Sequence, residues 1–246
     1  MENRKSKERI KEICDSSQKL SSALDGMTFS KPVKVTYNPL NYAWAAYADY
    51  LQKYAGDRKE YLFLGMNPGP FGMMQTGIPF GEIKAVKDWL KIKGTINKPK
   101  IEHEKRPIIG WECNRSEVSG RRLWGLFEKK FERAENFFQN HFVMNYCPLG
   151  FLSETGSNIT PDKIPQSEMN PVIDLCDQHL KEVCQALEIT TAIGIGAYAK
   201  KRLEKSLAGS NIRLGVILHP SPASPKANKD WAGTATQQMI DQEFWN

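Results

Sequence analysis

Four short apolar runs, separated by longer stretches of helical periodicity, constrain the fold of this chain more than any other feature. The apolar runs span residues 61–65, 141–146, 190–196 and 213–218, and the main helical patterns span 118–135, 171–187, 197–208 and 228–243. Near-continuous apolar strands that alternate with helices indicate a parallel sheet covered by helices on both faces. The pattern predicts an α/β fold, in which ligands bind beyond the carboxyl ends of the strands.

Two rigid loops follow the first and the last of these strands, and each carries one neutral polar side chain. The first loop begins Gly65-Met66-Asn67-Pro68-Gly69-Pro70, and the last begins His219-Pro220-Ser221-Pro222. Glycines let the backbone approach a flat ligand closely, and prolines hold the turns rigid. Asn67 alone would more often cap a turn than act in catalysis. Together with Asn145, Gly196 and His219 at neighbouring strand ends, it indicates an active site without a metal.

The composition fits one α/β domain preceded by a basic segment. The chain has 246 residues, a net charge of +6 and 40% hydrophobic residues, enough for one substantial core. We expect an N-terminal basic helix or arm over residues 1–30 and a single domain over 31–246. The positive charge suits DNA or RNA, although many basic proteins bind neither. A long insertion, about 83–117, is rich in lysine and is either a solvated face or a rim that follows a phosphate backbone.

Several classes of site are excluded or disfavoured by what the sequence lacks. It has no P-loop, no H-E-x-x-H pair and no G-x-S-x-G elbow. The five cysteines lack metal-ligand spacing, which favours reduced thiols, and no apolar run is long enough to cross a bilayer. We therefore expect an intracellular protein, in the cytoplasm of a bacterium or the nucleus of a eukaryote. His103, His141 and His179 are expected to be structural or solvated.

The loops at the strand ends resemble two motifs of a known family. Residues 65–82 are similar to the first motif of the single-strand-selective monofunctional uracil-DNA glycosylases, and residues 219–231 resemble their second motif. Residues 116–125 and 145–149 match in order between them, and the resemblance covers about residues 32–243. It implies a three-layer α/β/α sandwich on a short, mainly parallel four-stranded sheet. It also implies a DNA base-excision repair enzyme that hydrolyses the N-glycosidic bond of uracil and leaves an abasic site.

The resemblance assigns roles to individual residues of this chain. The family residue that matches Asn67 positions the attacking water, and the one that matches His219 donates a hydrogen bond to the departing uracil. Phe80 matches a residue that stacks on the base, and Asn145 one that reads the pyrimidine edge. In the family, the backbone that corresponds to the stretch between the first strand and residue 73 shapes the pocket. The resemblance therefore also implies substrate contacts for Met66, Gly69, Phe71 and Met73.

The second motif is expected to contact DNA and to supply the wedge that occupies the space vacated by an everted base. The residues expected to do so are Ser221, Pro222, Ala223, Ser224, Lys226 and Lys229. The implied partner is uracil-containing DNA, single- or double-stranded, bound by a monomer that uses no cofactor, no metal and no membrane.

Two departures from the family pattern leave the substrate range open. Vertebrate members carry Arg-Asn where this chain has Ala223-Ser224, and histidine where it has Met144. A small alanine fills a base-sized gap poorly, so activity on duplex DNA and strand preference are open. Oxidised bases and deaminated purines (xanthine and hypoxanthine) are further substrates to consider. The alternatives from other classes are a lesion-binding module without catalysis and an enzyme that acts on free nucleotides.

Overall fold

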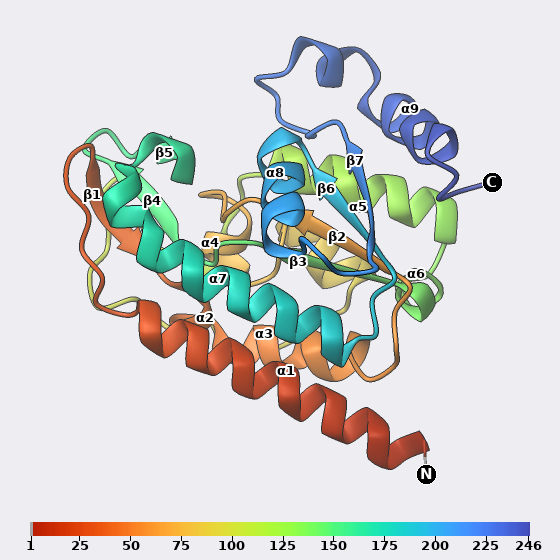
Figure 1. Cartoon of the computed structure of the whole chain (residues 1–246). Helices are drawn as coiled ribbons and strands as arrows, with labels where there is room; N and C mark the ends of the chain where they lie inside the picture. Colours follow the sequence, from red (N-terminus) through yellow and green to blue (C-terminus); the bar gives the residue numbers. More distant parts are fainter. Residues whose placement is uncertain (1) are drawn as a thin grey trace.

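A parallel four-stranded sheet lies at the centre of the molecule, in the order β3-β2-β6-β7 (Figure 1). The computed structural model describes residues 2–246. The central strands are β2 (Tyr61–Gly65), β3 (His141–Asn145), β6 (Thr191–Ile195) and β7 (Arg213–Ile217). Each lies within one residue of the bounds that the apolar runs predict. Gly65 pairs with Asn145, and Ile195 with Ile217, so the four carboxyl ends meet at one edge of the sheet.

Helices cover both faces of this sheet, which confirms the expected α/β class. The face that carries Phe63 and His141 packs against α5 (Val118–Phe131) and α6 (Ala134–Asn140) through aromatic contacts. The opposite face lies behind α7 (Gln166–Ala186) and α8 (Ala197–Ser206), and Phe142 there contacts Tyr50 of α3 (Trp44–Tyr54) (Figure 1). Burial on both faces explains why the strands read as continuous apolar runs.

A second, antiparallel sheet stands beside the first and was not expected from the sequence. It pairs β1 (Val33–Tyr37) with β4 (Gly150–Ser153), and β4 with β5 (Asn158–Ile159). Short helical segments complete the fold: α2 (Pro39–Tyr42), α4 (Met73–Thr76), η1 (Ala85–Trp89), η2 (Gly110–Glu112) and η3 (Pro161–Lys163). The last helix, α9 (Pro225–Asp241), follows the loop that begins at His219 and packs against β7 and α5.

The lysine-rich N-terminal segment forms the long helix α1 (Glu2–Leu24), which packs along α7 (Figure 1). Its apolar positions Ile13, Leu20 and Leu24 are buried, as their helical spacing predicts. The division of the chain into an arm and a domain at about residue 30 stays a prediction. No helix within residues 2–246 is both long and apolar enough to cross a membrane.

Candidate active site

A cavity of about 630 Å³ lies at the carboxyl edge of the central sheet and is lined by both of the loops singled out above. Its volume is within the range of small-molecule sites. The predicted residues that line it are Met66, Asn67, Gly69, Met73, Phe80, Asn145, His219, Ser221, Pro222, Ala223 and Ser224. Phe71, Lys226 and Lys229 are not among the residues that line it. The topology therefore brings the amide after β2 and the imidazole after β7 to one cavity.

The side chain of Asn67 is held by one hydrogen bond that fixes which end of the amide is free. Its Nδ2 donates to the carbonyl oxygen of Leu149, at 3.4 Å. Its Oδ1 is buried and has no hydrogen-bond partner among the described residues. A buried acceptor without a partner is costly unless a water or a ligand satisfies it. Asn67 thus has an unpaired acceptor, and no base, in the wall of the cavity.

The imidazole of His219 is neutral, and its one proton lies on Nε2. Its Nδ1 accepts a hydrogen bond from the backbone N–H of Ser221, at 3.1 Å, so this nitrogen carries no proton. Burial lowers the pKa of His219 to about 4. Gly196, at φ +91°, lies directly against the ring, and a Cβ at this position would come within 2.9 Å of His219 Cβ. His219 therefore presents a neutral N–H donor at neutral pH.

The side chains of Asn145 and Phe80 lie together against Gly65, the last residue of β2. A Cβ at Gly65 would meet Asn145 Oδ1 at 2.2 Å and the Phe80 ring at 2.5 Å, so only glycine fits there. Asn145 Nδ2 lies 3.2 Å from the sulfur of Met73, which is a weak acceptor. In the described part of the chain, no backbone group binds this amide. The backbone of the described residues therefore does not fix the orientation of this amide.

The backbone of Phe80 is held in an uncommon conformation by α5. Its φ of 53° is in the left-handed region, which costs free energy for a bulky residue. The carbonyl oxygen accepts a hydrogen bond from Trp124 Nε1 at 3.0 Å. The ring of Phe80 lies 6.2 Å from the ring of His219. Both rings thus border the same space, and one helix fixes the position of Phe80.

Glu117 is a cavity residue to which the sequence analysis gave no role. It is the N-cap of α5, where its Oε2 accepts a hydrogen bond from Gly120 N–H at 2.6 Å. Burial raises the pKa of this carboxyl. Ser119, Asn158, Thr160 and Tyr198 also line the cavity and were not predicted. Glu117 and Ser119 lie in a segment that matches the family in order, which was the only signal available for either.

The side chain of Phe71 lies beside two arginines. The guanidinium of Arg115 stacks on its ring at 3.9 Å from the centroid, and that of Arg106 lies at 5.3 Å. Arg115 is exposed, and both arginines belong to the basic insertion after β2. The Phe71 ring therefore orders two positive groups beside the loop that carries Asn67.

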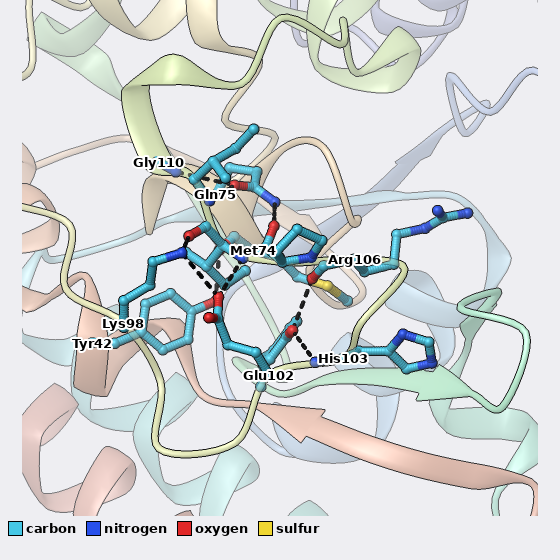
Figure 2. A network of polar contacts seen from close by, with 12 residues as sticks. Tyr42, Met74, Gln75, Lys98, Glu102, His103, Arg106 and Gly110 are labelled. Atoms are coloured by element: carbon cyan, nitrogen blue, oxygen red, sulfur yellow. Dashed lines mark hydrogen bonds and ion pairs between the residues drawn. The ribbon is translucent and has the colours of Figure 1, made fainter.

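Gln75 connects this insertion to the wall of the cavity (Figure 2). Its Nε2 donates to the carbonyls of Pro70 and Pro107, and its Oε1 accepts from the N–H groups of Ile109 and Gly110. All four hydrogen-bonding positions of this buried amide are therefore used. Figure 2 shows that the side chain of Arg106, by contrast, extends away from this network.

The remaining histidines have the structural surroundings expected of them, since all three are buried and hydrogen-bonded. His103 Nε2 lies 2.9 Å from Ser153 O, His141 Nδ1 lies 2.9 Å from Phe137 O, and His179 Nδ1 lies 2.7 Å from Ser16 Oγ. Within residues 2–246, no group of three or more His, Cys, Asp or Glu side chains is arranged to hold a metal ion.

Comparison with known proteins gives consistent results for sequence and for fold. The model of the uracil DNA glycosylase superfamily matches residues 52–242. The chain is 44% identical over 223 residues to the single-strand selective monofunctional uracil-DNA glycosylase of Rattus norvegicus, covering 90% of this chain and 80% of that protein. It is 43% identical to the Bos taurus protein of the same description, covering 90% and 82%.

A solved structure shares the fold at lower identity. The crystal structure of wild-type Pedobacter heparinus SMUG2 superposes with a TM-score of 0.64 at 22% identity, and the match covers 94% of this chain and 95% of that one. The similarity in fold therefore extends over nearly the whole chain.

Proposed function

This chain belongs to the uracil DNA glycosylase superfamily, and from this membership we propose that it removes uracil from DNA as a monofunctional glycosylase. Water takes the place of the base at C1′ of the deoxyribose, so the products are free uracil and an abasic site. The enzyme is thus a hydrolase of base-excision repair. The observation that carries the proposal is the convergence of Asn67 and His219 on one cavity.

The chemistry of these two side chains suits bond cleavage before attack by water. An amide cannot remove a proton from water near neutral pH, so Asn67 can only hold the water through its free Oδ1. This is sufficient if the sugar has already become an oxocarbenium-like cation, which is strongly electrophilic. The main requirement is then to stabilise the departing uracil anion, for which His219 supplies a neutral N–H donor.

The cavity also supports removal of the base without cleavage of the strand. Cleavage by a bifunctional glycosylase requires an amine that can form a Schiff base with C1′. None of the described residues that line the cavity is a lysine. Hydrolysis by water is therefore the reaction that the lining residues favour.

Uracil would enter the cavity everted from the base stack. Phe80 would stack on the base, and Asn145 would bond its Watson–Crick edge, while the Gly69–Met73 turn would stand beside C5. The loop from Ser221 to Ser224 would contact the strand, with Lys226 and Lys229 near phosphates. The proposed substrate is single- or double-stranded DNA, and the proposed enzyme acts as a monomer. The five unpaired cysteines support an intracellular location.

The test is uracil release under enzyme excess, without added metal and with a chelator present. A single-stranded oligonucleotide with one uracil should acquire one alkali-labile site, and a matched oligonucleotide with thymine should not. Binding of uracil DNA without release would instead indicate a lesion-binding module. Release of xanthine or hypoxanthine in preference to uracil would indicate the purine-lesion alternative, and activity on free deoxyuridine alone would indicate a nucleotide enzyme.

A further inference from the structure

We propose that Arg122 and Asn228 form a clamp on the loop from His219 to Ser224, and that this clamp determines how well the enzyme acts on duplex DNA. The proposal rests on the proposed function, because it assigns that loop to the DNA strand. Arg122 lies in α5 and Asn228 in α9, so the loop is held from two helices.

The clamp consists of three hydrogen bonds, two of them to carbonyl oxygens of the loop. Arg122 donates from one terminal nitrogen to Pro220 O and from the other to Asn228 Oδ1, both at 2.9 Å. Asn228 Nδ2 then donates to Pro222 O at 2.8 Å. The planar guanidinium fork matches this pair of acceptors, and neither acceptor is a carboxylate. Arg122 is therefore a positioning residue for the loop.

Arg122 also connects this loop to the loop that follows β2. Helix α5 carries Trp124, which binds Phe80 O, and Gly120, where a Cβ would come within 2.0 Å of the same oxygen. Because the helix is rigid, its contacts at Phe80 and at Pro220 fix the separation of the two loops. The donor ring of His219 precedes Pro220 directly, so the clamp sets where that ring stands relative to Phe80.

Duplex DNA should depend on the clamp more strongly than single strands do. Everting a base from a duplex breaks pairing and stacking, and the loop must then occupy the vacated space. Ala223 offers only a methyl group, so the backbone of the loop has to fill that space. A backbone can do so only if it is held in place, which is the function we assign to Arg122 and Asn228.

The experiment compares single-turnover uracil release from a single strand and from a matched A·U duplex. We expect Arg122→Ala to lower the rate on the single strand by about tenfold and on the duplex by about 100-fold, as misplaced groups typically do. Arg122→Lys keeps a donor for Pro220 but cannot bridge to Asn228, so it should be intermediate. Asn228→Ala should lower the duplex rate by about three- to tenfold and leave the single-strand rate within about twofold.

Arg121→Ala is the matched control, because it removes the same charge from the neighbouring position of α5. Arg121 is exposed, and its side chain donates to Ser116 Oγ at 3.2 Å. We expect it to behave as the wild type on both substrates. Thermal unfolding verifies that each variant is folded, and the exposed Asn228 keeps the test open if Arg122→Ala fails to fold.

Two outcomes separate this proposal from the proposed function. If the wild type releases uracil but Arg122→Ala and Asn228→Ala lower both rates by the same factor, or not at all relative to Arg121→Ala, the clamp proposal is wrong. If the wild type releases no uracil from either substrate, the proposed function itself is wrong, and the clamp proposal is wrong with it.

Discussion

Asn67 has an orientation that leaves only one end of its amide free to hold a water molecule. Nδ2 donates to Leu149 O, and Oδ1 has no partner in the described residues. Since Asn67→Ala removes this acceptor, we expect the single-turnover rate of uracil release to fall at least about tenfold. Enzyme in excess over a uracil-containing single strand, quenched with alkali, measures the rate. A value close to the wild-type rate would contradict the role assigned to Asn67.

His219 is expected to act as a neutral donor, which makes a clear prediction for the pH dependence. Its pKa is lowered to about 4, so the ring stays neutral from pH 8 down to about 5 and its donor is unchanged. The rate should therefore show no inflection near 6.5, and His219→Ala should lower it at least about tenfold at every pH in this range. A rate that falls as the pH rises through 6.5 would show that a charged imidazole is required. Nitrogen chemical shifts of His219 test the tautomer directly.

At the scale of elements, substitution of the two glycines of α5 by alanine should change the stability of the protein in opposite directions, because only one of them packs against Phe80. Glycine inside a helix costs about 0.5–1 kcal/mol relative to alanine. At Gly125 no atom lies within 4 Å of an added Cβ, so Gly125→Ala should stabilise the protein by about that amount. At Gly120 the added Cβ would stand 2.0 Å from Phe80 O, so the steric clash should outweigh the gain.

Urea unfolding of both variants measures this difference, and uracil release from single strands provides a second observable. We expect Gly120→Ala to unfold at lower urea and to lose activity, because Phe80 has to move. Equal stabilisation by both alanines would mean that Phe80 is free to shift, and that α5 does not fix its position.

The central strands could be predicted because burial on both faces produces an apolar run that is visible in one sequence. The antiparallel sheet could not, since Asn158–Ile159 contributes two residues and β4 only four. Strand β4 of this sheet begins just after Leu149, whose carbonyl orients Asn67, so the free acceptor of that amide was not predictable either. The role of Glu117 could not be predicted for a related reason, because its place in the cavity depends on a tertiary contact between α5 and the loop after β2.

At the scale of the whole molecule, part of the net charge of +6 lies on two arginines beside Phe71, in the loop that carries Asn67. Phe71 stacks with the exposed Arg115 and lies close to Arg106, and we expect Arg115 to contact a phosphate. Each phosphate contact contributes about −0.7 to the slope of log affinity against log salt for single strands. We expect Arg115→Ala to reduce the magnitude of that slope by about this amount for single-stranded DNA. Arg133→Ala, which removes a charge paired with Glu135, is the control and should leave the slope unchanged.

Acid should destabilise the protein before its carboxylates are neutralised, because desolvation keeps three of its four histidines neutral. Burial lowers the pKa of His141, His179 and His219 from 6.5 to about 4. The unfolded chain therefore binds protons between these values that the folded protein does not bind. The stability contributed by neutral burial is fully present above pH 6.5 and is lost as the pH falls towards 4.

Each histidine accounts for at most about 3 kcal/mol of unfolding free energy over that interval. Urea unfolding at pH 7.5, 6.5, 5.5 and 4.5 measures the total, and its slope against pH gives the number of protons taken up on unfolding. His179 lies on α7, contacts Ser16 of α1 and does not line the cavity, so His179→Gln should reduce that number by one without changing uracil release at pH 7.5. An unfolding free energy that is constant from pH 7.5 to 4.5 would mean that these imidazoles gain their protons in the folded protein at ordinary pH, and the neutral donor assigned to His219 would then be wrong as well.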